Sequence, residues 1–112
     1  MGEHVAADVS ELPSELADRI AAATAHARCR RIERRGAGYA VYALSGDRIV
    51  VMELALRSDG SVSERTDSVV LGTVRHVISR HGATFLGVTE YESERLIEVP
   101  AEFAATLRSS LS

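Results

Sequence analysis

Residues 39–57 read YAVYALSGDRIVVMELALR, and this stretch decides the fold. Two apolar runs, residues 39–44 and 49–56, flank the turn-forming sequence Ser-Gly-Asp-Arg at 45–48. Runs of β-branched and large apolar residues bounded by turn residues are typical of strands. The stretch therefore predicts a β-hairpin.

The predicted hairpin is apolar on both faces. Successive side chains of a strand point to opposite sides, so its second strand divides into two sets. The even positions are wholly apolar and are predicted to face the core: Val50, Met52, Leu54 and Leu56. The odd positions are the candidate interface for a partner or a second copy of the chain: Ile49, Val51, Glu53 and Ala55. A sheet with one wet face alternates apolar and polar residues, so another element, a second copy or a partner must cover this face.

Composition excludes several classes of protein. The chain of 112 residues can bury one core without disulfides or metals, and its 46% hydrophobic and 26% charged content is ordinary for a soluble protein. No apolar run approaches the roughly 20 residues that span a bilayer, and no signal-peptide pattern is visible, so we expect a cytoplasmic protein without membrane contact.

Cys29 is the single cysteine, which excludes an intrachain disulfide and the cysteine clusters of zinc sites. The net charge of −3 gives no global attraction to nucleic acid, and the all-arginine basic set suggests a GC-rich, bacterial genome.

The other predicted elements are helices before and after the hairpin, a second strand pair and a C-terminal helix. Helices are expected over 14–34 and 67–81, strands over 84–91 and 95–99, and a last helix from Pro100 with Phe103, Leu107 and Leu111 buried. Residues 62–66 fit a short strand or a loop.

The order α-β-β-(β)-α-β-β-α predicts an α+β fold, because strands and helices do not alternate one for one. We expect a two-layer sandwich, with an antiparallel or mixed sheet of four or five strands and helices mainly on one face. Residues 1–12 are expected to be a flexible lead-in, and residues 13–112 a single domain.

Two charged segments of opposite sign are candidate binding surfaces. The basic one is a candidate anion-binding cluster, although cations also gather at helix C-termini to complement the helix dipole: Arg28, Arg30, Arg31, Arg34 and Arg35. The acidic one can protect a sheet edge, or dock against the arginines of a second subunit: Glu90, Glu92, Glu94, Glu98 and Glu102.

Glu53 is the most informative single carboxylate, because it lies in the middle of an apolar strand. A helix, a hairpin with an acidic residue on its second strand, a helix and a strand resemble the layout of metal-dependent nucleases of the restriction-endonuclease-like type. In that family a lysine follows the acidic residue two positions later, where this chain has Ala55, and no acidic strand before Asp47 completes the metal site. The resemblance implies a nucleic-acid-binding domain on a degenerate form of that fold, using the arginine cluster. The alternative is that Glu53 simply pairs with an arginine.

No pattern of residues indicates catalysis, a metal or a cofactor. His26 and Cys29 are three positions apart, but two ligands are too few for a metal site. No nucleophile elbow or glycine-rich phosphate loop is present. The sequence thus favours a protein that is not an enzyme, with no cofactor, no metal and no catalytic residue.

We therefore expect a non-enzymatic protein-binding or regulatory domain that acts as a homodimer. The element order resembles that of small acidic secretion-chaperone-type dimers, which implies a chaperone-like or adaptor-like role. Its partner segment would lie against Ile49, Val51 and Ala55, or add a strand at the edge formed by residues 90–99. Nucleic-acid binding by the arginine cluster is the alternative function.

Overall fold

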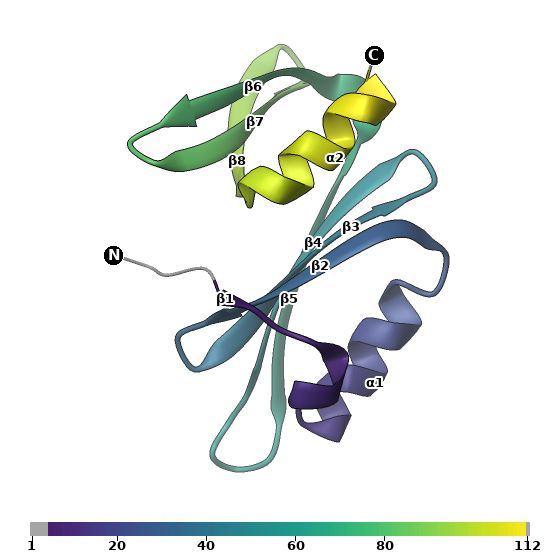
Figure 1. Cartoon of the computed structure of the whole chain (residues 1–112), viewed down its shortest axis with the longest axis vertical. Helices are drawn as coiled ribbons and strands as arrows, with labels where there is room; N and C mark the ends of the chain where they lie inside the picture. The colour runs from purple at the N-terminus through teal and green to yellow at the C-terminus, as the bar shows by residue number, and fades with distance from the viewer. Residues whose placement is uncertain (1–4, 112) are drawn as a thin grey trace.

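The computed structural model describes residues 5–111, with side chains described for residues 6–109. The fold is α+β, with two antiparallel sheets and two α-helices (Figure 1). The larger sheet has the strand order β1 to β5: Val5–Ala6, Ala27–Arg35, Gly38–Ser45, Arg48–Leu56 and Val62–Val70. The smaller sheet has the order β6 to β8: Val74–Arg80, Ala83–Glu90 and Ser93–Val99. The helices are α1 at Ser14–Ala23 and α2 at Ala101–Leu111, and two short 3-10 turns lie at Val9–Glu11 and Leu71–Thr73.

The predicted hairpin is confirmed as β3 and β4, joined by the turn at Gly46 and Asp47. Gly46 has φ 62°, a conformation that glycine adopts without a steric penalty. Residues 62–66, which fit either a strand or a loop in the sequence, form the first part of a strand that extends to Val70 as β5. The second strand pair is confirmed as β7 and β8, and the last helix as α2, with Phe103 and Leu107 buried. The side chain of Leu111 lies outside the described residues.

Two helix predictions need correction. The helix predicted over 14–34 is confirmed at Ser14–Ala23 as α1, but residues 27–35 form β2 and not its continuation. On a helix the arginines of this segment would face one another at spacings of three and four, and like charges at that spacing are destabilising. The second, expected over 67–81, is the end of β5, a 3-10 turn and β6. This segment contains six β-branched residues between Val69 and Ile78, which lose side-chain freedom on a helix and favour strands.

The strands form two sheets, and the two helices lie on opposite faces of the larger one (Figure 1). The structure therefore does not have the expected two-layer sandwich of one sheet with helices mainly on one face. On one face α1 packs with Leu16 and Ile20 against the even positions Met52 and Leu54 of β4. On the other face α2 and the smaller sheet pack against Tyr42, Leu44 and Ile49. The Tyr42 and Phe103 rings are 5.9 Å apart between centroids and inclined at 45°, a favourable tilted contact.

The segment before α1 contacts the larger sheet. β1 pairs with β2, and the amide of Ala7 donates to the carbonyl of Ile32 at 2.8 Å. Leu12 is buried in the core beneath α1. Residues 5–12 of the expected lead-in therefore pack against the fold, and residues 1–4 lie outside the described part of the chain.

The turn between β7 and β8 places two non-glycine residues in the left-handed region. Tyr91 has φ 47° and Glu92 has φ 69°, and the Tyr91 side chain is fully exposed. A two-residue hairpin loop with both central φ values positive favours Asn followed by Gly.

We predict that Tyr91→Asn combined with Glu92→Gly raises the free energy of unfolding by about 1 kcal/mol, because it relieves this backbone strain. The matched control is Gly82→Ala in the β6–β7 turn, where φ is +79° and the added Cβ meets no other atom within 4 Å. That substitution should lower the unfolding free energy by about 1 kcal/mol. Urea denaturation of the three proteins measures both effects, and equal midpoints for all three would contradict the turn geometry.

Candidate functional site

The candidate interface on the odd positions of β4 is mostly covered by the chain itself. Ile49 is 0% exposed, and Val51 is half-buried against the same core cluster, which α2 and the smaller sheet complete. Ala55 is half-buried and Glu53 is exposed. A second copy is therefore not needed to cover this face, and the dimer expected there loses its physical basis.

We predict that Ile49→Ala lowers the free energy of unfolding by about 3 kcal/mol, because it opens a cavity in the core. Glu53→Gln on the same strand is the matched control, and its effect should stay within about 0.5 kcal/mol, as for other exposed positions. Chemical denaturation measures both. A small effect of Ile49→Ala on stability would contradict the burial of this face.

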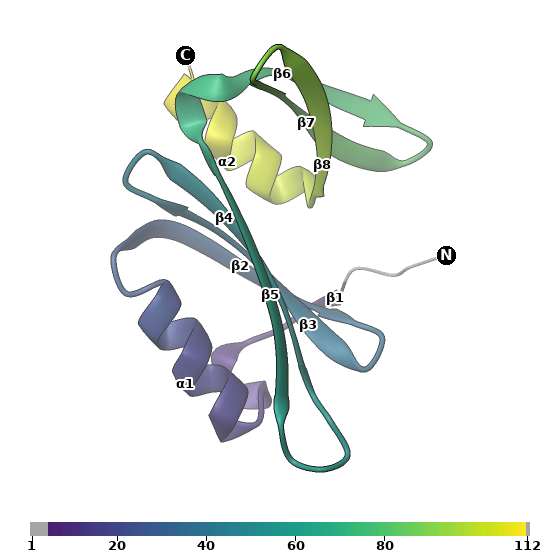
Figure 2. The same cartoon turned by 180° about the vertical axis from the view of Figure 1, so that it is seen from behind.

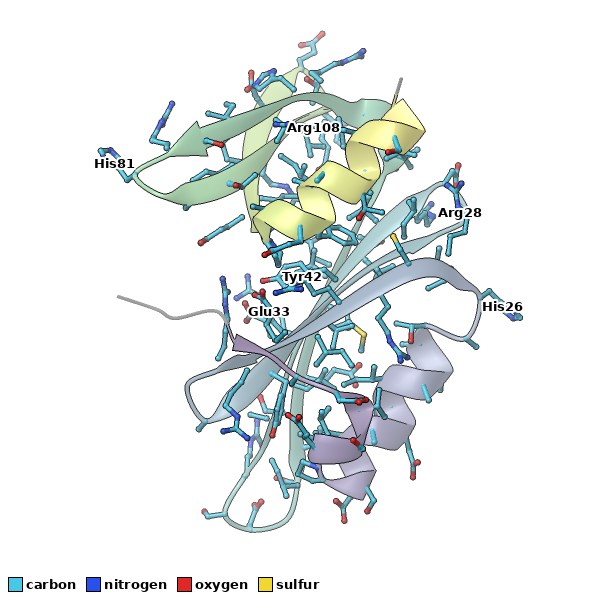
Figure 3. The ribbon with its side chains drawn as sticks, in the orientation of Figure 1. His26, Arg28, Glu33, Tyr42, His81 and Arg108 are labelled. Atoms are coloured by element: carbon cyan, nitrogen blue, oxygen red, sulfur yellow. The ribbon has the colours of Figure 1, made fainter. Side chains whose placement is uncertain are left out.

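The arginine cluster does not form one surface. Arg30 and Arg34 alternate with Ile32 on the α1 side of β2, where Arg30 Nη1 donates to Thr24 Oγ1 at 3.1 Å. Arg31 and Arg35 point to the opposite side and are half-buried. Arg28 donates to the carbonyl of Gly46 at 2.9 Å, at the far end of the strand from Glu33 (Figure 3). The cluster expected from the sequence is thus divided between two faces and a turn.

A cleft of about 1000 Å³ opens where Arg31 and Arg35 point. Its walls come from β2 and the following turn, from the β6–β7 turn, and from the junction of β8 with α2. Glu33 and Tyr42 project into the space between the larger sheet and α2 (Figure 3). The charged lining residues are Arg31, Glu33, Arg35, Glu98 and Glu102, with His81 on the β6–β7 turn.

Glu33 is the carboxylate at the base of the cleft and is only 1% exposed. Its Oε2 accepts from Arg31 Nε at 2.9 Å. A buried carboxylate requires such a partner, since an unpaired charge in the interior is costly. Sequence reasoning missed Glu33, because the segment was assigned to a helix. The signal that could have indicated Glu33 was its position between arginines and next to the apolar Ile32.

Two longer ion pairs connect the walls of the cleft. Arg31 Nη2 is 3.8 Å from Glu102 Oε2, and Arg35 Nη2 is 3.9 Å from Glu98 Oε2. These contacts bring the basic and acidic segments together, but within one chain and not between two subunits. At such distances, and with partly exposed side chains, each pair contributes at most about 1 kcal/mol.

A second hollow, of about 340 Å³, continues from Arg35 across β4 and β5 to β8. Glu53 lies here, opposite Arg65 in the β4–β5 register. Arg95 Nη1 contacts Asp67 Oδ2 at 3.1 Å, and Arg95 Nη2 contacts Glu90 Oε1 at 3.1 Å. The two hollows share Arg35 and Glu98, so the charged lining of the cleft continues into the second hollow.

Tyr42 has a perturbed pKa. Burial raises the pKa of its phenol to about 12, while the nearby Arg35 lowers it and the carboxylates of Glu33, Glu98 and Glu53 raise it further. The neutral phenol is therefore favoured in the folded state.

We predict that this shift destabilises the fold at alkaline pH. The unfolded chain releases the Tyr42 proton near pH 10 and the folded chain near pH 12, so stability is lost as pH rises above 10. The unfolding free energy should fall by about 1 kcal/mol between about pH 9 and about pH 11 from this group alone. Tyr42→Phe should remove that part of the pH dependence, whereas Tyr91→Phe should retain it. Equal pH dependence in the two variants would contradict the shift.

No protein family, curated protein or solved structure matches the chain. Within residues 5–111, no group of three or more His, Cys, Asp and Glu side chains is placed to hold a metal ion. His26 lies in the turn after α1 and Cys29 on β2. Neither described helix is long and apolar enough to cross a membrane.

Proposed function

We propose that the chain is a non-enzymatic protein-binding domain, and that the cleft between the layers receives a charged segment of a partner protein. The observation that supports this proposal is the wall of paired charges around the cleft of about 1000 Å³. Arg31 faces Glu102 at 3.8 Å and Arg35 faces Glu98 at 3.9 Å, distances at which the pairs are weak and exchangeable. Charged groups of a partner can replace them without leaving a buried charge unpaired.

The balance of charge indicates which segment fits best. The cleft is lined by two arginines and three glutamates, which leaves one net negative charge with His81 neutral. Glu33 is engaged by Arg31, so Glu98 and Glu102 are the carboxylates nearest the opening that a ligand can reach. A segment that carries lysine or arginine beside polar residues complements this lining, and complementary charge contributes to specificity and association rate.

The proposed setting is the cytoplasm. Cys29 is the single cysteine and cannot form an intrachain disulfide, which suits a reducing compartment.

We predict that peptides selected from a random phage-displayed library against the wild-type protein are enriched in lysine and arginine. Glu98→Arg reverses the charge at the cleft and should abolish the enrichment. Glu92→Arg makes the same change on the exposed β7–β8 turn, outside the cleft, and should preserve it. Amide NMR shifts on adding a selected peptide should concentrate at Gly36, Gly82 and Ala101, which line the cleft.

Selection of the same peptides by the Glu98→Arg variant, or amide shifts that map to the α1 face, would contradict the proposal. The amide NMR spectrum of each variant first verifies that the variant is folded.

Nucleic-acid binding by Arg28, Arg30, Arg31, Arg34 and Arg35 is the alternative, and the division of these arginines between surfaces makes it weaker. Phosphate contacts give an affinity that declines steeply with salt. We expect no fluorescence-anisotropy change with a DNA duplex at about 50 mM salt, conditions in which nonspecific phosphate binding is detectable. Salt-sensitive binding that is lost in Arg30→Glu would support the alternative instead.

A further inference from the structure

The outer edge of β5 is a long strand edge that no described strand pairs with. β5 is the last strand of the larger sheet, and Figure 2 shows it lying in front of the other strands. Its central side chains are polar and exposed: Glu64, Arg65, Thr66, Asp67 and Ser68. An exposed edge is a template for a further strand, and proteins either block it or use it.

The hydrogen bonds at the two ends of the β4–β5 ladder show which backbone groups point outward. Arg57 N donates to Ser61 O at 2.8 Å, and Leu71 N donates to Asp47 O at 2.6 Å. Both pairs continue the β4–β5 register, which runs without a shift from Arg48–Val70 to Leu56–Val62. Since hydrogen-bonded pairs alternate along an antiparallel ladder, the odd residues of β5 bond to β4. The even residues present their N–H and C=O groups to the outside: Val62, Glu64, Thr66, Ser68 and Val70.

We propose that β5 pairs with β5 of a second copy of this chain, antiparallel and about a two-fold axis through Thr66. An antiparallel pair requires that outward-facing residues meet outward-facing residues, so even positions must pair with even positions. A two-fold axis through Thr66 satisfies this condition. It also pairs all nine residues of the strand with the nine residues of the second copy.

This register also matches the side chains. Arg65 lies opposite Asp67 of the partner subunit, and this contact occurs twice because of the two-fold symmetry. Val62 lies opposite Val70 of the partner subunit, which covers a valine that is 37% exposed in the single chain. Opposite charges and apolar pairs directly across a sheet are stabilising, whereas like charges are destabilising.

The other registers compatible with the ladder are less favourable. Centring on Glu64, Arg65 or Asp67 places that residue opposite its own copy, so two like charges meet at the axis. Centring on Ser68 brings no charged pair together. The sequence of β5 is thus complementary to itself around Thr66.

The two charged groups are positioned for this contact. Arg95 holds the Asp67 carboxylate at 3.1 Å, on the side of the sheet that carries the smaller sheet. Within the described part of the chain, Arg65 has no ion-pair partner within 4.0 Å, and its side chain is exposed on the same side. Pairing with Asp67 of the partner subunit therefore completes a row of alternating charges. This inference is independent of the proposed cleft, because peptide binding and dimer formation are measured separately.

The test exchanges the charges at positions 65 and 67 and measures the molar mass by light scattering after size-exclusion chromatography. The wild-type chain should elute with twice its mass of 12.1 kDa at about 100 μM, a concentration suited to a weak interface. Arg65→Asp and Asp67→Arg should each be monomeric, because each places like charges across the axis. An equimolar mixture of the two variants should recover the dimer, because every cross-strand contact is then between opposite charges. The double variant Arg65→Asp with Asp67→Arg should also be dimeric.

Recovery on mixing separates loss of the interface from loss of folding, since two misfolded variants would not restore a defined dimer. A monomeric wild-type chain overturns the proposal. Single variants that remain dimeric also overturn it, because the dimer then uses another surface.

The register is tested by disulfide trapping. Thr66→Cys in a Cys29→Ser background places two thiols at the axis, where paired Cα atoms lie about 5.5 Å apart, within disulfide reach. Mild oxidation should give a covalent dimer, and Ser93→Cys in the same background should not. Equal trapping at both positions would contradict the register.

Discussion

The structure depends on the burial of both faces of one strand pair. β3 and β4 carry large apolar side chains on each side, with Val41, Met52 and Leu54 on one face and Tyr42, Leu44 and Ile49 on the other. Burial of each such side chain contributes about 1.5–3 kcal/mol to the stability of the fold, so neither face is stable when exposed to solvent. The chain covers the first with α1 and the second with α2 and the smaller sheet. The layered arrangement in Figure 1 follows from this requirement.

The cleft exists because α2 and the smaller sheet cover their face of the hairpin only in part. The smaller sheet and α2 close over Tyr42 and Ile49, while Glu53 at the other end of β4 stays exposed. Charged residues of both layers line the opening that remains, and only Glu33 is fully withdrawn from water. Apolar contacts thus set the position of the layers, and the weaker ion pairs occupy the space that these contacts leave. A partner can replace the ion pairs at little cost to the fold.

Local pattern was enough to predict the hairpin, its turn, the β7–β8 pair and the start of α2, because each is encoded in a few neighbouring residues. Pattern failed where one segment fits two periodicities. Ile32 and the arginines around it satisfy a helical spacing. The strand instead places Ile32 in the core beneath α1 and divides the arginines between two faces. The cleft could not be predicted from spacing at all. Glu33 and Glu98 are 65 positions apart in the chain, and only the packing of two layers brings their surroundings together.

The central claim is that the C-terminal part of the chain covers the second face of the hairpin, and the contact between Tyr42 and Phe103 tests it most directly. Their ring centroids are 5.9 Å apart, so a nuclear Overhauser spectrum of the wild-type protein in solution should show cross-peaks between the two rings. The same spectrum should show strand-type cross-peaks between β2 and β3 at Ile32 and Val41, which are paired in the register. Absence of the ring contact, together with helical chemical shifts over residues 27–35, would contradict the account.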